Sequence, residues 1–253
     1  PLTAERVTSA PVKTLRLQTF GIGESTIQQL IDDDPEPWPS SVTLGFRAGL
    51  PQLELKLSVQ RDEDLTDRAQ CRQQLERLFG DHIIGEASST LAMELQRILR
   101  EQGKTMTTAE SCTGGLIAAM LTREPGASAV FEAGFVTYSN AMKRTVLGVS
   151  EQDLATEGAV SETVVRQMLA GALARSGADV GVAVSGIAGP DGGTPEKPVG
   201  TVWLAWGSAE SVHTRRVVIP GSREFFQTLV AAAGLDLVRR QLLGLPSEPH
   251  YIH

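Results

Sequence analysis

The sequence predicts a mixed α/β protein in which a small α+β domain at residues 12–85 precedes a three-layer α/β/α domain at residues 88–244. In both parts, short apolar or alternating segments of strand length are separated by segments with helical spacing. Residues 178–189 are apolar almost throughout, which is typical of a strand covered by helices on both faces. The 253 residues are enough for two domains with cores of their own.

Residues 12–85 show strand and helix patterns in the order β-α-β-β-α-β. Strands are expected at residues 12–20, 42–48, 53–60 and 81–86, and helices at residues 23–34 and 64–79. The first helix ends in the proline-rich acidic segment DDDPEPWPSS, and GLPQ joins the second and third strands as a hairpin. Cys71 lies in the second helix and is interpreted as a packing residue. This order predicts a small α+β sandwich.

Residues 88–244 alternate strands with helices, which predicts a sheet covered on both faces. Ser88 or Ser89 can cap the first helix, and Gly103 ends it. Asn140 can cap a short helix in the middle of the domain. Strands are expected at residues 104–110, 129–139, 178–189, 200–207 and 211–221, and helices at residues 88–103, 113–126, 140–148, 150–158, 161–177 and 223–244.

Charge and composition narrow the classes of function. The net charge of −7 and the pI of about 5.2 argue against a general nucleic-acid-binding protein, although they are compatible with a small anionic ligand held by a few cations. The two cysteines lie far apart in the sequence, so neither a disulfide framework nor a zinc site is indicated. We therefore expect a reducing, cytoplasmic compartment. No apolar run approaches the roughly 20 residues of a membrane helix. The first residues show no signal-peptide pattern, and the missing initiator Met fits a fragment or a processed product.

The stretch TTAESCTGG, residues 107–115, joins a buried strand to a helix. Such a turn lies at the mouth of an α/β sheet, where the helix offers unpaired N–H groups and a partial positive charge. Gly114 and Gly115 allow a ligand to approach the backbone closely. The stretch therefore suits an oxyanion or a phosphate. It lacks the Gly-Lys-Ser/Thr of a P-loop and the Gly-x-Ser-x-Gly of a nucleophile elbow.

Three candidate nucleophiles stand side by side in this turn: Ser111, Cys112 and Thr113. A serine needs a base, and none of the four histidines has a position that points to this turn. Lys143 lies on the short helix after the next strand. A lysine can also activate a serine, because burial can leave its amine neutral and able to take the hydroxyl proton. Tyr138 ends that strand at the same rim of the sheet. The spacing is thus compatible with a Ser111–Lys143 pair. A lysine on a short helix is usually solvated and a tyrosine at a strand end usually packs, so these alternatives stay open, as do the thiol and the threonine hydroxyl as nucleophiles.

A second glycine-rich segment, residues 185–200, also follows a buried strand and is expected to form a long loop at the same edge of the sheet. Gly186 and Gly189 permit close backbone contacts with a ligand. Cations suited to a phosphate follow in a late strand and at the start of the last helix: Arg215, Arg216 and Arg223.

Several motifs of the second domain together resemble the C-terminal domain of the CinA family, the competence/damage-inducible proteins. They are TTAESCTGG, FEAGFVTYSNAMKRTVLGV, GAVSE and VSGIAGPDGGTPEKPVGTVW, in this order within residues 88–244, followed by the arginine-bearing strand. In the first domain, LQTFGIGES is similar to the KH-like middle segment of full-length members. Those members carry a further N-terminal domain, similar to molybdopterin-binding proteins and associated with ADP-ribose pyrophosphatase activity. We expect that domain to be absent here and do not transfer its activity.

The resemblance implies hydrolysis of the carboxamide of nicotinamide mononucleotide to nicotinic acid mononucleotide and ammonia, which recycles pyridine nucleotide toward NAD. It implies Ser111 as the nucleophile and Lys143 as the base, with Thr113 and Tyr138 orienting the base or the ribose. Substrate contacts are then expected from Glu110, Cys112, Gly114, Gly115, Asn140, Gly186, Ile187, Ala188, Gly189, Arg215, Arg216 and Arg223.

We expect no metal or other cofactor, because no cluster of His, Cys or Asp has ligand spacing. The expected partners are the small-molecule substrate and a second copy of the chain, with neither membrane nor nucleic acid. A function of a different class stays open. A nucleotide-binding or interaction module without turnover would fit the family's link with competence and DNA damage, as well as the KH-like part.

Overall fold

The structure is a computed structural model that describes residues 12–246. The chain forms two compact units, one ending at Ser89 and the other beginning at Thr90. None of the described helices combines the length and the apolar character needed to cross a bilayer. Nor do residues 12–246 contain three or more His, Cys, Asp or Glu side chains grouped so as to hold a metal ion.

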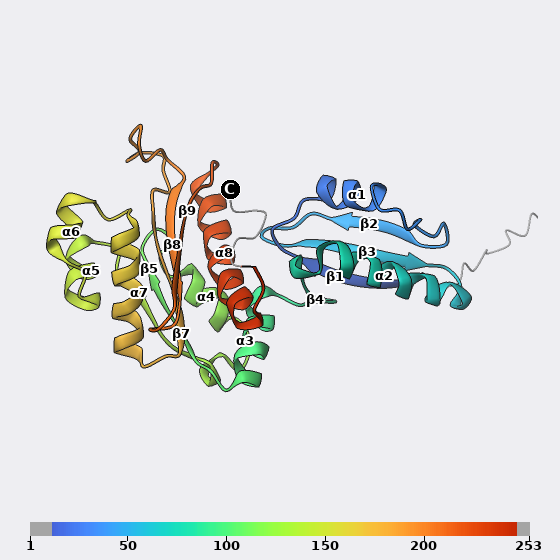
Figure 1. The fold of residues 1–253 in the computed structure, drawn as a ribbon, viewed down its shortest axis with the longest axis horizontal. Helices are drawn as coiled ribbons and strands as arrows, with labels where there is room; N and C mark the ends of the chain where they lie inside the picture. Colours follow the sequence, from blue (N-terminus) through green and yellow to red (C-terminus); the bar gives the residue numbers. More distant parts are fainter. Residues whose placement is uncertain (1–11, 247–253) are drawn as a thin grey trace, which may run out of the picture. The chain divides into compact units, whose positions relative to one another are not determined.

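The first unit is an antiparallel four-stranded sheet with two helices (Figure 1). Its elements follow in the expected order: β1 (Lys13–Thr19), α1 (Glu24–Asp32), β2 (Thr43–Arg47), β3 (Leu53–Val59), α2 (Leu65–Phe79) and β4 (Ile83–Glu86), with 3₁₀ turns at Asp62–Asp64 and Gly80–His82. The strand order in the sheet is β2-β3-β1-β4. The likeness of this unit to a KH segment stays a prediction.

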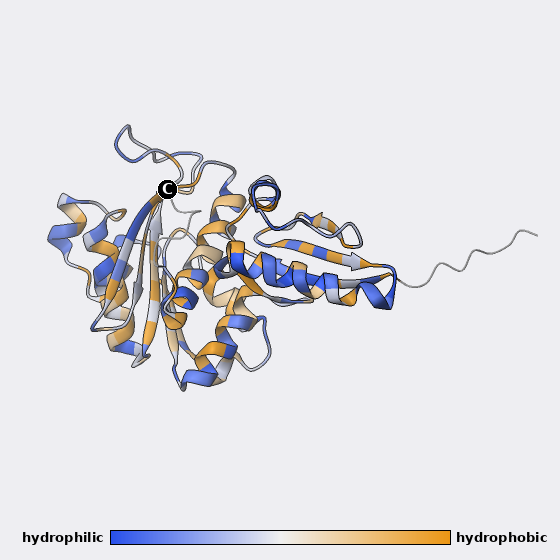
Figure 2. Cartoon of the chain, turned by 45° about the vertical axis from the view of Figure 1, so that its right-hand side comes forward, coloured by the Kyte–Doolittle hydropathy of each residue, from blue (hydrophilic) through white to orange (hydrophobic). Residues whose placement is uncertain are grey.

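The core of the first unit lies between one face of its sheet and the two helices. Leu55 and Leu57 of β3 belong to one apolar cluster with Ile27 of α1 and Leu75 of α2. Cys71 is fully buried in the same cluster, in agreement with the packing role expected for it. In Figure 2, α2 carries both hydrophilic and hydrophobic residues along its length, as expected of a helix with one buried face.

The second unit is a five-stranded mixed sheet in the order β6-β5-β7-β8-β9. Its elements are α3 (Leu91–Gln102), β5 (Met106–Glu110), α4 (Leu116–Thr122), a 3₁₀ turn (Ala127–Ala129), β6 (Phe131–Val136), α5 (Asn140–Leu147), α6 (Glu151–Thr156), α7 (Glu162–Ser176), β7 (Val180–Gly186), β8 (Thr201–Gly207), β9 (Val212–Val218) and α8 (Arg223–Leu243). Strands β6, β5 and β7 run parallel, whereas β8 and β9 pair antiparallel to their neighbours.

The second unit has three layers. Figure 1 shows α5, α6 and α7 on one side of the sheet and α3, α4 and α8 on the other. Strand β5 is buried along its whole length and β7 along nearly all of it, because both faces of these central strands are covered. The predicted mixed α/β fold is therefore confirmed.

Two helix caps differ from the expected ones. Thr90 caps α3 by accepting a hydrogen bond from the N–H of Met93, whereas Ser88 or Ser89 was expected. Ser139 caps α5 by accepting from the N–H of Met142, and Asn140 is the first residue inside the helix. In both cases the capping residue has an extended backbone, which directs its side-chain oxygen to the N–H three residues later.

The end of β5 lies where the order of strands in the sheet reverses. From β5 the chain passes to β6 on one side, and it later returns to form β7 on the other side of β5. Glu110, the last residue of β5, lies opposite Val136 of β6 and Val184 of β7. In open α/β sheets, ligands bind at the carboxyl ends of the strands at such a reversal. The predicted site turn begins at this point.

Candidate active site

Ser111 is the first residue after β5 and begins the turn into α4. Its N–H donates to the carbonyl of Val184 on β7 (3.1 Å), so its backbone is tied to the neighbouring strand. Its own carbonyl accepts from the N–H of Gly114 (3.1 Å). Gly114 and Gly115 have φ values of +63° and +102°, a left-handed conformation that favours glycine. The tight turn therefore fixes the serine at the end of a central strand.

The side chain of Lys143 reaches Ser111 from α5. Its Nζ atom donates to Ser111 Oγ (2.9 Å), to the carbonyl of Thr137 (2.8 Å) and to the carbonyl of Tyr138 (3.2 Å). Lys143 is 1% exposed and Ser111 is 8% exposed. The two residues are 32 positions apart in sequence, and the parallel pairing of β5 with β6 brings them together. The expected juxtaposition of hydroxyl and amine is therefore present in the fold.

Burial lowers the pKa of Lys143 to about 8, because desolvation disfavours the charged amine. The described residues supply no carboxylate within ion-pair distance of this amine, so nothing restores the pKa to its usual range. A lysine with a pKa near 8 is partly neutral at neutral pH and can accept a proton. Lys143 thus has the properties of a general base.

Cys112 is a poor nucleophile in this environment. Burial raises the pKa of its thiol to about 12, and the charge of Glu110 adds to the increase. The thiolate is the reactive form of cysteine, so a thiol with this pKa stays protonated and inert at neutral pH. Cys112 is buried, as a small packing residue would be.

Glu110 stabilises the turn from inside. Its Oε2 atom accepts from the N–H groups of Gly115 and Ile117 (both 3.0 Å) and from the Thr113 hydroxyl (2.7 Å). Its Oε1 atom accepts from the N–H of Ala118 (2.9 Å) and the hydroxyl of Thr108 (3.3 Å). The carboxylate is fully buried at the N-terminus of α4, where the helix dipole favours a negative charge. Glu110 and Thr113 thus have internal structural contacts, and the roles toward the substrate and the base expected from the sequence stay predictions.

The bonds of Glu110 restrict which backbone N–H groups can face a ligand. The N–H groups of Gly115, Ile117 and Ala118 point at its carboxylate, and the N–H of Gly114 points at the Ser111 carbonyl. Within the part of the chain that the structure describes, the N–H groups of Cys112 and Thr113 have no acceptor. These two amides directly follow the serine, so they form a candidate oxyanion hole. In a nucleophile elbow, the amide after the nucleophile has this role.

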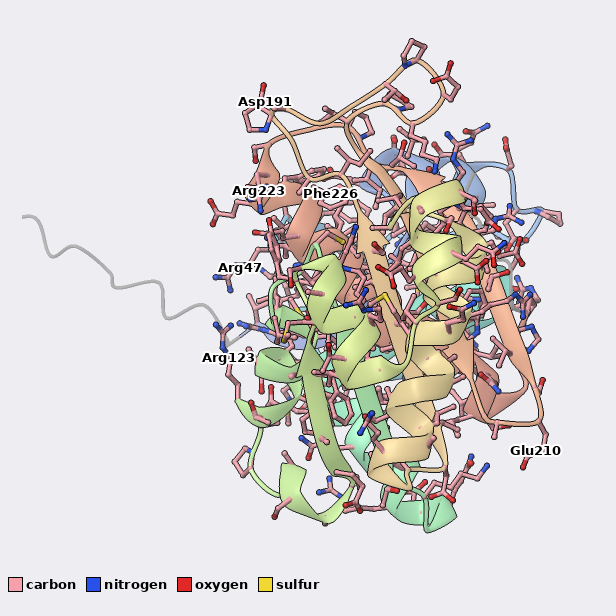
Figure 3. All side chains as sticks on the ribbon, turned by 90° about the vertical axis from the view of Figure 1, so that its left-hand side faces the viewer. Arg47, Arg123, Asp191, Glu210, Arg223 and Phe226 are labelled. Carbon is pink, nitrogen blue, oxygen red and sulfur yellow. The ribbon has the colours of Figure 1, made fainter. Side chains whose placement is uncertain are left out.

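Arg223 connects three segments around the turn. It donates from Nη1 to the carbonyl of Gly189 (2.9 Å) and from Nη2 to the Tyr138 hydroxyl (3.0 Å). Figure 3 shows Arg223 at the end of this unit where Asp191 lies, with Glu210 at the opposite end. Both acceptors of Arg223 are neutral. Tyr138 itself is 60% exposed, so its ring is accessible at the mouth of the site.

The other two arginines lie on the edge strand β9, which β7 and β8 separate from β5. Strands lie about 4.8 Å apart, so β9 is roughly 14 Å from β5. Arg216 donates to the carbonyl of Glu196 (2.7 Å), and Arg215 lies opposite Leu204.

Asn140 borders a hollow, whereas Gly186 is required by strand packing. Asn140 lines a hollow of about 280 Å³ between α5 and α6, together with Arg144 and Glu151. A Cβ at Gly186 would lie 2.8 Å from the carbonyl oxygen of Thr201, so close packing of β7 against β8 requires glycine there. Ile187 pairs with the same carbonyl through its N–H (2.8 Å), and Ala188 is buried. In that segment, only the Gly189 carbonyl touches a residue around the turn.

Two contacts of the site were not expected from the sequence. The backbone carbonyl of Thr137 binds the Lys143 amine, and the side-chain amide of Gln227 on α8 donates to the carbonyl of Cys112 (2.8 Å). Gln227 lies four residues after Arg223, one helical turn along the same face of α8. That spacing is the signal by which it could have been found.

The site brings together a hydroxyl, an amine with a lowered pKa and two backbone amides without an acceptor among the described residues, which are groups that acyl transfer uses. The family model for the CinA C-terminal domain matches residues 88–242, which contain every one of these groups. The chain belongs to the CinA C-terminal domain family. The resemblance read from the motifs is thereby confirmed.

Curated relatives of this CinA-family chain match both of its units. A "CinA-like protein" of Colwellia psychrerythraea is 49% identical over 240 residues, which cover 94% of this chain and 56% of the relative. A protein of Shewanella oneidensis named "Nicotinamide-nucleotide amidohydrolase PncC" is 38% identical over 236 residues, covering 93% and 55%. The chain spans about half the length of the curated relatives it matches.

Solved structures of CinA proteins match much of this chain. The competence damage-inducible protein A (ComA) of Klebsiella pneumoniae is 41% identical with a TM-score of 0.59, covering 60% of this chain and 95% of its own. The competence/damage inducible protein CihA of Agrobacterium tumefaciens is 43% identical with a TM-score of 0.59, covering 60% and 93%. At these identities, the likeness extends to sequence as well as to fold.

Proposed function

We propose that this chain hydrolyses the carboxamide of nicotinamide mononucleotide, giving nicotinic acid mononucleotide and ammonia. The observation that carries the proposal is the buried contact of 2.9 Å between Lys143 Nζ and Ser111 Oγ. The name of the Shewanella oneidensis relative supports the choice of substrate. The two free amides after Ser111 support an acyl-transfer reaction, because a tetrahedral oxyanion needs such donors.

Lys143 acts as the base when its amine is neutral. A neutral amine has two N–H donors and one lone pair, and the carbonyls of Thr137 and Tyr138 provide acceptors for the two donors. The lone pair then faces the Ser111 hydroxyl. As Lys143 takes the proton, Ser111 Oγ attacks the amide carbon. The oxyanion that forms is stabilised by the N–H groups of Cys112 and Thr113, at roughly 3–4 kcal/mol for each good donor.

The protonated Lys143 then donates its proton to the nitrogen of the leaving group. The C–N bond breaks, ammonia departs, and the nicotinoyl group of the nucleotide stays esterified to Ser111. In the second half of the reaction, neutral Lys143 takes a proton from a water molecule that attacks the ester. Collapse of that second tetrahedral intermediate returns the proton to Ser111 and releases the carboxylate product.

Arg223 binds the phosphate of the nucleotide. Among the described residues it has no carboxylate partner, and its two acceptors are a carbonyl and a phenol, which a phosphate dianion can displace. The exposed ring of Tyr138, beside the base and bonded to Arg223, is placed to contact the ribose or the pyridine. Arg223 and Tyr138 together set the distance between the phosphate and the scissile amide.

The proposal extends to the setting of the reaction. The activity belongs to the recycling of pyridine nucleotide in the cytoplasm, the chain acts as a homodimer, and it binds no nucleic acid. The net charge of −7 supports the last point, because nucleic-acid-binding proteins usually carry a basic excess. Sedimentation of the purified chain, alone and with single-stranded RNA at physiological salt, tests the dimer and the absence of nucleic-acid binding.

The experiment for the reaction is the release of ammonia from nicotinamide mononucleotide. The wild type and Cys112→Ala should turn over, whereas Ser111→Ala should lose at least about 10³-fold in kcat. Lys143→Arg should lose a similar factor, because a guanidinium keeps its charge and cannot take the proton. If Cys112→Ala alone abolishes turnover, the nucleophile is the thiol and the mechanism is wrong.

A further inference from the structure

Gln227 makes a contact that the reaction as described leaves unexplained. Its Nε2 atom on α8 donates to the carbonyl oxygen of Cys112 across a separation of 115 residues (2.8 Å). Gln227 is partly buried, and it lies in the first turns of α8, one turn after Arg223. The acceptor belongs to the peptide unit that joins Cys112 to Thr113. That unit also carries one of the two free N–H groups.

The planarity of the peptide unit links the two groups. In a trans peptide the C=O of one residue and the N–H of the next point in opposite directions. The Cys112 carbonyl points toward α8, so the N–H of Thr113 points away from it. Figure 1 shows α8 and α5 on opposite sides of the sheet, and Lys143 reaches Ser111 from α5. The N–H of Thr113 is thus directed to the side on which the serine hydroxyl lies.

The other peptide units of the turn are fixed by different partners. Gly114 binds the Ser111 carbonyl, and Glu110 binds the N–H groups of Gly115, Ile117 and Ala118. The unit between Cys112 and Thr113 is held by a side chain of α8. Without an acceptor or donor to hold it, this unit could rotate its N–H away from the hydroxyl.

We propose that Gln227 is a positioning residue that holds the N–H of Thr113 toward the oxyanion formed at Ser111. Gln227 touches neither the substrate nor the reacting atoms and acts through the Cys112 carbonyl. The inference rests on the proposed function, since it assigns the means by which the oxyanion hole of that reaction keeps its geometry. It predicts an effect on catalysis that exceeds any effect on substrate binding.

The test uses two variants of Gln227. Gln227→Met keeps the length of the side chain but lacks the N–H donor, and Gln227→Glu keeps its shape but carries a carboxylate that cannot donate.

Gln96→Met is the matched control. Gln96 is buried and donates from Nε2 to the carbonyl of Leu121 (2.9 Å), so it makes the same kind of bond at the other end of α4. Thermal unfolding of each variant shows how much stability each bond contributes.

Two rates are measured for each protein. One is ammonia release from nicotinamide mononucleotide, resolved into kcat and KM. The other is covalent labelling of Ser111 by a fluorophosphonate, read by mass spectrometry. In the labelling reaction Ser111 Oγ attacks phosphorus and fluoride leaves, and the P=O oxygen occupies the oxyanion hole. The labelling rate therefore reports on the hole without needing the amide substrate.

Both Gln227 variants should lose about tenfold or more in kcat and in labelling rate, with KM within about twofold of the wild type. Gln96→Met should lose stability while both rates stay within about twofold of the wild type.

The inference is overturned if Gln227→Met keeps the wild-type values of both rates, if only its KM changes, or if Gln96→Met is slowed as much as the Gln227 variants. Should the wild type be labelled at Ser111 but release no ammonia, the proposed substrate is wrong and the labelling rates still decide the role of Gln227. A wild-type Ser111 that neither turns over nor is labelled contradicts both proposals.

Discussion

Lys143 donates from its buried amine to the hydroxyl of Ser111 at 2.9 Å, across the adjacent carboxyl ends of β5 and β6. The same amine is bound by the carbonyls of Thr137 and Tyr138 and by no carboxylate of the described residues. Carbonyl acceptors orient the N–H bonds without adding the negative charge that would keep the amine protonated. This environment converts an ordinary lysine into a base with a pKa of about 8.

The depressed pKa of Lys143 makes folding stability depend on pH. Between the folded value of about 8 and the usual 10.5, the unfolded chain holds a proton that the folded chain has lost. The free energy of unfolding therefore rises with pH across this window, by up to about 3 kcal/mol relative to Lys143→Met. Urea denaturation of both proteins at the two ends of the window measures this difference. A difference that is constant or falls with pH would mean that the amine is not buried as described.

Glu110→Gln should destabilise the second unit by about 2–3 kcal/mol, because an amide cannot accept from all the donors that converge on the carboxylate. Thr113→Val removes one of those donors, so it should lower the free energy of unfolding by a smaller amount, about 1 kcal/mol. Urea denaturation checks both values. If Glu110→Gln kept full stability but lost affinity for the nucleotide, the ligand-binding role expected from the sequence would be restored.

Arg223→Met should raise KM for nicotinamide mononucleotide by about 10- to 100-fold, the loss of one charge-assisted contact. Nicotinamide riboside lacks the phosphate, so its KM should change by no more than about twofold in the same variant. Arg216→Met is the control, because it removes the same kind of cation from the edge strand β9, which β7 and β8 separate from the strand that precedes Ser111. Equal effects on nucleotide and nucleoside would show that Arg223 does not bind the phosphate.

Much of the fold could be predicted from the sequence, because the spacing of apolar residues and the glycines that end helices are local features of the chain. The apolar run of β7 and the glycines at Gly103 and Gly148 mark elements whose ends the structure places close to the expected positions. The caps were less predictable, since Ser139 rather than Asn140 takes the extended backbone that a cap requires. Neighbouring polar residues compete for this position, and residue type alone does not decide between them.

The juxtaposition of Ser111 and Lys143 could be predicted because both follow consecutive strands that end at one edge of the sheet. The placement of the three arginines could not be predicted, because it depends on the order of the strands, which puts Arg215 and Arg216 on the far edge of the sheet. The internal contacts of Glu110 could not be predicted, because its partners are mostly backbone N–H groups, which every residue carries and no motif reveals. Gln227 escaped notice for the same reason, since its acceptor is a carbonyl.

The pH dependence of kcat/KM for nicotinamide mononucleotide tests most directly whether neutral Lys143 is the base. The amine must be unprotonated to accept the Ser111 proton, so the rate should rise with pH and level off above the pKa of about 8. Ammonia release measured from about pH 6 to pH 10 covers this range. A rate that is independent of pH across it, or that falls as pH rises through 8, would contradict a neutral-lysine mechanism.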